Sequence, residues 1–239
     1  MRDDGVIDEA YEQLHATGPE FDGWLSNHGP MAAEAMVRHG HASEVQKWLD
    51  GYVRRLEPLP RGQSPIGDDW QGALGDARRI GDWTSYFVRS VSERPWRDVL
   101  NVWWPRLLPG LAAAATHGVI RVGHAVRTLM QDGDSPTRVT ELAHGLAYWA
   151  ARWQAVPGAK DAFNGGSAVD GALTPHEVLQ HLPRLSPQSG GIRERFDRLA
   201  DMTAWPSAAA VLRLPVAPEE TEGWLAGLVD TAVVNYLWY

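Results

Sequence analysis

Hydrophobic positions along the 239-residue chain recur with the period of an α-helix, and no run of residues alternates convincingly between hydrophobic and polar. This pattern predicts an all-α fold, and the length suits a single irregular multi-helix domain over residues 1–239. Pro- and Gly-rich connecting loops are expected at 57–69, 156–171 and 185–191, the second of them as a surface loop rather than a lid. The expected helices cover residues 7–16, 30–39, 43–56, 81–93, 96–115, 117–131, 136–153, 175–182, 191–201, 206–213 and 219–238.

The last expected helix carries a continuous apolar stripe from Trp224 to Leu237, and the sequence ends on Tyr-Leu-Trp-Tyr without a polar cap. Large apolar groups at such a position need a surface to cover them. Three explanations are open at this point. The helix docks on the core, it forms an interface such as a homodimer contact, or the chain was once longer.

Composition narrows the function classes. A net charge of −8 with scattered arginines argues against nucleic acid as a partner. The sequence has no apolar run near 18 residues and an acidic N-terminal stretch, which predicts neither a membrane span nor a signal peptide and hence a cytoplasmic protein. Twelve Trp against four Phe predict a tryptophan-rich core or pocket lining, with the core favoured. Without cysteine, any metal site must use His and oxygen ligands.

The stretch LSNHGPM places His28 directly before Gly29 and Pro30. Gly is accepted at a helix cap and Pro suits the first turn, so a helix is expected to begin here. The positive end of that helix dipole favours the neutral imidazole of His28, which can bind a metal or act as a base. A histidine that only packs and hydrogen-bonds is the more common alternative.

The stretch THGVIRVGHAVR predicts a helix in which His117, Arg121 and His124 share one face at positions i, i+4 and i+7. Gly118 and Gly123 flank this stripe, and each costs about 1 kcal/mol of helix stability relative to Ala unless a substrate or a neighbouring helix approaches closely. A ligand site and a solvated polar face with small packing residues are equally open here.

Together with His28, the histidines His117 and His124 could supply most of a first-row metal site with open positions for water, oxygen or substrate. His144 is either a core histidine or a member of the same pocket. The sequence has no glycine fingerprint of a flavin or nicotinamide fold, no phosphate-binding loop, no nucleophile elbow and no HExxH zinc motif.

Three blocks, LSNHGPMAAEAMVRHG, WWPRLLPGLAAAATHGVIRVGHAVRTL and LAHGLAYWAARW, resemble in order and spacing the signature segments of the questin oxidase-like family. The resemblance runs from about Ala10 to about Val234. It implies a helical oxidoreductase of secondary metabolism that opens an aromatic polyketide-like ring with O2, as in Baeyer–Villiger oxidation. The resemblance also implies non-heme iron, with several His ligands and a carboxylated lysine in at least one relative.

Matched residue by residue, the resemblance makes His28 and His117 iron ligands and His124 a ligand or pocket residue. Arg121 is then a candidate for balancing an anionic substrate oxygen, and the expected catalytic set is His28, His117, His124 and Arg121. The expected partners are a small hydrophobic aromatic substrate and O2, with NADPH as an optional co-substrate. Trp149 and Trp153 could stack on substrate, although core packing is favoured for both.

The resemblance has one departure. Relatives continue past the segment matching LVDTAVVNYL into further histidine-bearing helices, so the resemblance implies a C-terminally truncated domain with an incomplete iron site. A second subunit docking at NYLWY could replace the lost ligands, but this is less favoured. The main alternative is a non-catalytic helical pseudoenzyme that binds a ligand or dimerises. A metal-dependent hydrolase ranks last, because the dipeptide HD is absent.

Overall fold

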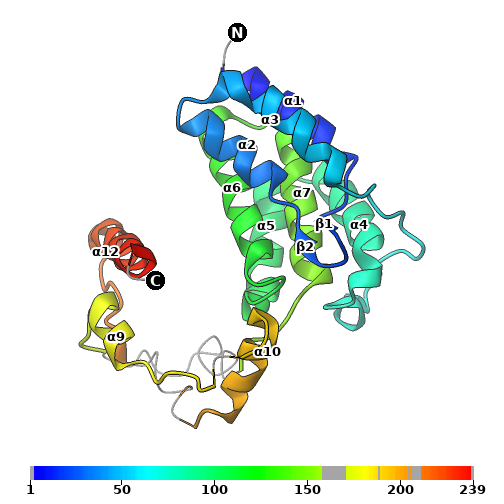
Figure 1. Cartoon of the computed structure of the whole chain (residues 1–239). Coiled ribbons are helices and arrows are strands. Elements are labelled where there is room, and N and C mark those ends of the chain that lie inside the picture. The colour runs from blue at the N-terminus through cyan, green and yellow to red at the C-terminus, as the bar shows by residue number, and fades with distance from the viewer. Residues whose placement is uncertain (1–2, 158–170, 188, 204, 206–210, 238–239) are drawn as a thin grey trace. The chain divides into compact units, whose positions relative to one another are not determined.

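The computed structural model describes residues 3–157, 171–187, 189–203, 205 and 211–237. The chain divides into two compact units, Met1–Ala155 and Val156–Tyr239, which are described one at a time (Figure 1). The architecture is all-α, which confirms the fold class that the hydrophobic periodicity predicts.

The first unit consists of helices joined by short 3₁₀ turns and loops. Its α-helices are α1 (Asp3–His15), α2 (Gly29–Arg38), α3 (Val45–Tyr52), α4 (Ile80–Glu93), α5 (Trp96–Leu107), α6 (His117–Asp132) and α7 (Pro136–Ala151). Helix α7 packs against both α4 and α6 and is the most deeply buried helix of this unit. This burial explains why Leu, Ala and aromatic residues occur on every face of the helix.

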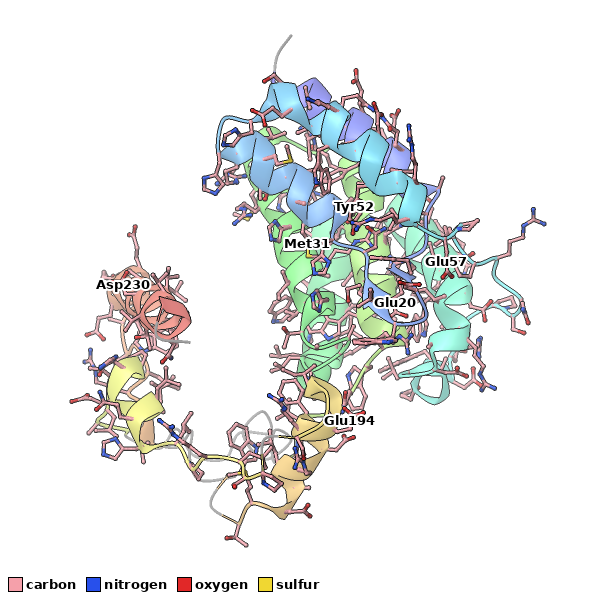
Figure 2. All side chains as sticks on the ribbon, viewed as in Figure 1. Glu20, Met31, Tyr52, Glu57, Glu194 and Asp230 are labelled. Carbon is pink, nitrogen blue, oxygen red and sulfur yellow. The ribbon has the colours of Figure 1, made fainter. Side chains whose placement is uncertain are left out.

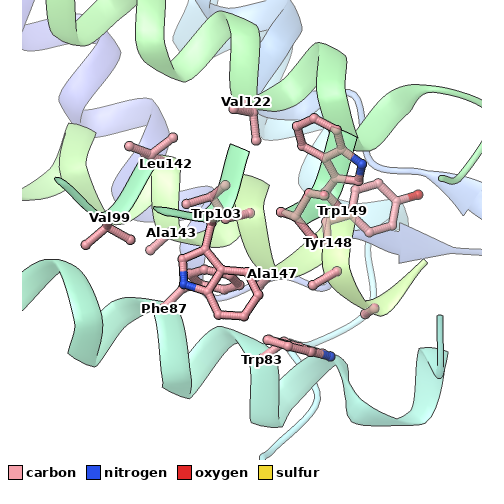
Figure 3. Packing of buried hydrophobic residues seen from close by; sticks show 14 of the residues in the cluster. Trp83, Phe87, Val99, Trp103, Val122, Leu142, Ala143, Ala147, Tyr148 and Trp149 are labelled. Atoms are coloured by element: carbon pink, nitrogen blue, oxygen red, sulfur yellow. The ribbon is translucent and has the colours of Figure 1, made fainter. Parts of the chain in front are cut away.

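Large aromatic side chains fill the main core. Trp103 of α5 lies edge-on to Phe87 and Trp83 of α4, with ring centroids 4.9 and 5.5 Å apart (Figure 3). Trp149 of α7 is fully buried, and its indole N–H donates to the Gly110 carbonyl at 3.0 Å. These contacts agree with the expected tryptophan-rich core and make Trp149 a packing residue.

A second, smaller core joins α1, α2 and α3. Ile7, Tyr11 and Leu14 of α1 pack with Ala33 of α2 and Leu49 of α3. The spacing of the α1 residues, i, i+4 and i+7, is that of one helix face. This packing fixes α2 against the rest of the unit and so determines where the chain entering α2 lies.

The expected helix at 96–115 is wrong in its second half. Helix α5 ends at Leu107 and continues only as a 3₁₀ turn, Leu108–Gly110. Pro109 has no N–H for a helical hydrogen bond. The backbone then turns through positive φ angles of 48, 54 and 72° at Ala114, Ala115 and Thr116 before α6 begins.

A two-stranded hairpin, β1 (Glu20–Phe21) and β2 (Leu25–Ser26), is the strand structure that the hydrophobic pattern missed. Two residues per strand are too few to show alternation. Its turn contains Asp22 and Gly23 at φ 55 and 82°, which are residue types that tolerate the left-handed region.

The second unit contains α9 (Pro175–His181), α10 (Ile192–Asp197) and α12 (Pro218–Leu237). Most of the expected helix at 206–213 and of the expected loop at 156–171 lies outside the described residues. On α12 the stripe residues Leu225, Val229 and Val233 are more than half exposed. Within the described part of the chain, no helix has both the length and the apolar character to cross a membrane.

Candidate functional site

Polar side chains of α2 and α6 meet along the contact between these two helices, which lie side by side (Figure 1). We call this contact the α2–α6 seam. His28, just before α2, contacts His117 at the start of α6. Further along, Glu34 contacts His124, and Arg38 contacts Gln131 near the ends of the helices. The seam therefore gathers two of the three expected histidines at one end.

His28 and His117 face each other through their Nε2 atoms, which are 2.9 Å apart. The rings are edge-to-face, with centroids 4.8 Å apart and an interplanar angle of 83°. His28 is exposed and His117 is half-buried. The structure thus brings together two histidines that are 89 residues apart in sequence, at a place that solvent can reach.

The hydrogen bonds made by the ring nitrogens that point away from the pair determine whether each facing Nε2 atom bears a proton or a lone pair. His117 Nδ1 donates to the Ala114 carbonyl at 2.7 Å, because a carbonyl oxygen can only accept. The neutral ring of His117 therefore presents a lone pair on Nε2. The His28 ring also donates a hydrogen bond to the Ser26 backbone, which favours the protonated form of that ring. At a separation of 2.9 Å, the two Nε2 atoms can share one proton in a hydrogen bond, or their lone pairs can converge on one metal ion.

The pKa of His28 is lowered from its usual value. Partial burial is the largest cause, the neighbouring His117 adds to it, and the hydrogen bond to the Ser26 backbone opposes both. The neutral form that this shift favours is the form that ligates metals.

The separation of the two nitrogens fits one shared metal ion. Nitrogens bound cis to a first-row ion, each at about 2.1 Å, lie about 3 Å from each other. The observed separation of His28 Nε2 and His117 Nε2 is 2.9 Å. A backbone carbonyl that accepts from the remote ring nitrogen is also typical of metal-bound histidine, and Ala114 does this for His117.

The chain segment before His117 is strained. Ala114, Ala115 and Thr116 have positive φ angles, a conformation that costs non-glycine residues, and β-branched ones most of all. The resulting turn brings the Ala114 carbonyl back onto the His117 ring. The strained backbone at these residues therefore helps to set the orientation of the His117 imidazole.

The segment entering α2 is held by hydrogen bonds to Tyr148 of α7 and to residues 17 and 18. Ser26 Oγ and the hydroxyl of Tyr148 are 2.8 Å apart, and the Tyr148 hydroxyl donates to Glu20 at 3.0 Å. Ser26 must then donate to Tyr148. The amide of buried Asn27 donates to Thr17 and to the Gly18 carbonyl.

The first N–H groups of α2 are also satisfied. The backbone N–H of His28 donates to the Tyr52 hydroxyl at 2.8 Å, and that of Gly29 donates to Asn27 Oδ1 at 2.9 Å. Figure 2 shows Tyr52 beside the start of α2, near Met31. Because these groups cap the helix, the His28 side chain is not used as a cap and is available to His117.

His124 does not join the pair. It lies seven residues after His117, about 10 Å further along the helix axis, and its Nδ1 donates to Glu34 at 2.8 Å. Burial alone would raise the pKa of Glu34, but hydrogen bonds from His124, Arg127 and Arg38 outweigh burial and lower it. Glu34 is therefore a carboxylate that holds His124 and Arg127 of α6 across the seam and Arg38 on its own helix.

Arg121 points into the core instead of toward the histidine pair. Its guanidinium donates to both carboxylate oxygens of Glu141 on α7, at 2.6 and 2.9 Å, and it is 3% exposed. His15 lies 3.2 Å from the same carboxylate, and the buried ring of His144 packs against His15. This geometry favours a structural role for Arg121 and places His144 in the core.

The close approach expected at the α6 glycines occurs at one of them. A Cβ on Gly118 would lie 2.8 Å from the Trp149 Cα of α7, whereas a Cβ on Gly123 would meet nothing within 4 Å. Helix packing therefore explains Gly118, and nothing in the structure explains Gly123. Trp153, the other expected stacking residue, is half-buried and packs against the main core.

A separate pocket of about 150 Å³ lies between the hairpin, the 57–60 loop and the ends of α4 and α7. Glu20, Tyr148 and Arg152 form its polar wall, and Phe21 and Pro58 belong to its apolar wall. Neither His28 nor His117 lines it. The pocket is linked to the histidine segment through the hydrogen bonds that Ser26 makes with Tyr148 and Asn27 makes with Gly18, since Tyr148 and Gly18 line the pocket.

In the part of the chain that the structure describes, no group of three His, Asp or Glu side chains is arranged to hold a metal ion. Among the described residues, the histidine pair therefore has no third His, Asp or Glu side chain arranged with it to hold a metal ion. Sequence reasoning missed Tyr52, Glu34 and Ser26, because no motif marks a residue whose role is to hold a histidine from a distant helix.

Comparison of the chain with protein-family models, with curated proteins and with solved structures finds no match.

Proposed function

We propose that this protein binds one first-row metal ion, ferrous iron foremost, between His28 Nε2 and His117 Nε2. We further propose that it uses this ion as an oxidoreductase that opens an aromatic ring with O2. The single observation that carries the proposal is the 2.9 Å approach of the two nitrogens, with the proton of His117 held on Nδ1 by Ala114. The class of reaction comes from the resemblance to the questin oxidase-like family, which rests on the sequence blocks alone.

The residues have separate tasks in this proposal. His28 and His117 hold the ion, and the strained turn at Ala114–Thr116 fixes the tautomer and orientation of His117. Iron supplies the redox chemistry that O2 needs before it can react with an organic molecule. With only two protein ligands among the described residues, the other positions around the ion are open to substrate and water.

A second function is supported by one specific observation. Two imidazoles without a third ligand within the described ranges can also share one proton and simply join α2 to α6. In that case the chain is a non-catalytic helical protein, and the exposed apolar residues Leu225, Val229 and Val233 of α12 suit ligand binding or dimerisation. We propose in addition that the protein is cytoplasmic and that it can form a homodimer through α12.

The test of the oxidoreductase is oxygen uptake with a defined probe. The protein is loaded anaerobically with ferrous iron, mixed with a hydroxylated anthraquinone, and exposed to ¹⁸O₂. We expect oxygen uptake that matches loss of the probe, with label in a ring-opened product. His28→Ala and His117→Ala should abolish uptake, while His41→Ala, at an exposed histidine away from the seam, should not. Iron-loaded protein that leaves a panel of such phenolic quinones intact would favour the non-catalytic function.

A further inference from the structure

Tyr52 at the end of α3 makes an unusual contact with the candidate site. Its hydroxyl accepts a hydrogen bond from the backbone N–H of His28 at 2.8 Å and also faces the backbone of Gly29. Tyr52 does not touch the facing nitrogens of the histidine pair itself. It contacts the peptide from which the His28 side chain extends.

The Tyr52 ring is firmly held. It is 8% exposed and stacks on Trp48 of the same helix, with centroids 4.7 Å apart and planes at 17°. Phe21 of the hairpin lies edge-on to it at 6.3 Å, and the Arg55 guanidinium lies 4.9 Å above its centre. A hydroxyl on a ring held from three sides is a fixed point in the structure.

We propose that Tyr52 is a positioning residue for His28, whose backbone it fixes so that the imidazole meets His117 in the geometry that accepts a metal ion. The proposal rests on the metal-binding function proposed above. A short segment with one anchored N–H has little freedom to rotate about the start of α2. The direction of the His28 Cα–Cβ bond is therefore determined by Tyr52 together with the Asn27 contact to Gly29.

A variant that lacks only the Tyr52 hydroxyl distinguishes the positioning role of this residue from its role in packing. Tyr52→Phe keeps the ring contacts with Trp48, Phe21 and Arg55 and loses only the hydroxyl, which accepts from His28 and faces the Gly29 backbone. The matched control is Tyr11→Phe, which removes the hydroxyl of another buried tyrosine. That hydroxyl lies 3.3 Å from Thr128 Oγ1 and does not contact the His28 segment.

Three readouts test the proposal on the full chain. Cobalt(II) and iron(II) titrations give the metal affinity, the visible spectrum of bound cobalt reports coordination, and amide hydrogen exchange at His28 reports the anchored N–H. We expect Tyr52→Phe to weaken metal binding about 10- to 100-fold, to change the cobalt bands and to speed exchange at His28. Tyr11→Phe should change neither affinity nor spectrum, even where it lowers the unfolding temperature.

The outcomes distinguish the two proposals. If the wild type binds metal and Tyr52→Phe binds it with the same affinity and spectrum, positioning by Tyr52 is overturned while the metal site stands. If the wild type binds no metal, the proposed function fails, and exchange at the His28 amide still decides the role of Tyr52. Exchange at the His28 amide that is faster in Tyr52→Phe than in the wild type, and unchanged in Tyr11→Phe, then supports the anchor. Equal exchange in Tyr52→Phe and the wild type overturns it.

Discussion

Arg121 Nε and Nη2 donate to the two carboxylate oxygens of Glu141, and both side chains are almost completely buried between α6 and α7. Burial alone would raise the pKa of Glu141, but the charge and hydrogen bonds of Arg121, together with His15, outweigh burial and lower it to about 2. Glu141 is therefore ionised at neutral pH. The pair connects the helix that carries His117 to the most buried helix of the first unit.

Breaking this pair from one side should destabilise the protein strongly. Glu141→Gln leaves the Arg121 guanidinium buried without a counter-charge, which costs about 3–5 kcal/mol in comparable pairs. Urea denaturation followed by circular dichroism measures the change. The double variant Arg121→Met/Glu141→Leu, which replaces both charges by apolar groups, should recover most of the loss. A loss in the double variant equal to that in Glu141→Gln would contradict the proposed cause.

Stability should fall as the pH is lowered from about 6.5, because of His144. Burial lowers its pKa to about 3, nearby His15 and Arg121 add to the effect, and Glu141 opposes it. The unfolded chain then binds a proton at His144 that the folded chain does not bind, so stability present above pH 6.5 is lost as the pH falls toward about 3. The slope from this one group is up to about 1.4 kcal/mol per pH unit.

Unfolding free energies at pH 6.5, 6.0 and 5.5 check this prediction above the range in which Glu141 begins to contribute, since its unfolded pKa is 4.5. His144→Gln should flatten the dependence in that range. His41→Gln, at an exposed position, should leave it unchanged. Parallel curves for the wild type and His144→Gln would show that the acid sensitivity originates elsewhere.

Gly118 and Gly123 offer a matched pair on one helix. Gly118→Ala introduces a methyl group 2.8 Å from the Trp149 backbone, so α6 and α7 must separate, and we expect a loss of about 1–3 kcal/mol. Gly123→Ala meets no atom within 4 Å and should gain about 1 kcal/mol from helix propensity. Thermal unfolding of both variants measures the difference. Equal effects at the two positions would argue against close packing of the two helices at Gly118.

The helices could be predicted from the sequence because their apolar stripes are long. Helix α6 begins at His117 and helix α7 at Pro136, as the periodicity and the turn residues indicate. The break after Leu107 was missed although Pro109 marks it, because the apolar run continues through the alanines that follow. The β1–β2 hairpin was missed because each strand has only two residues.

Only part of the candidate site could be predicted. The location of His28 before a helix and of His117 at the start of another could be derived from local signals, but their contact joins residues 89 positions apart. Helical spacing placed His117, Arg121 and His124 on one face and could not show that Arg121 turns to Glu141 and His124 to Glu34. Those partners are chosen by tertiary packing, which periodicity does not encode.

The most direct test of the central claim is the iron content of the full chain after anaerobic reconstitution and removal of excess metal, measured by elemental mass spectrometry. We predict about one iron ion per chain in the wild type. His28→Ala and His117→Ala should lose the iron, and His124→Ala, whose imidazole faces Glu34, should retain it. A wild type that holds no iron, or a His28→Ala or His117→Ala protein that holds as much as the wild type, would contradict the account.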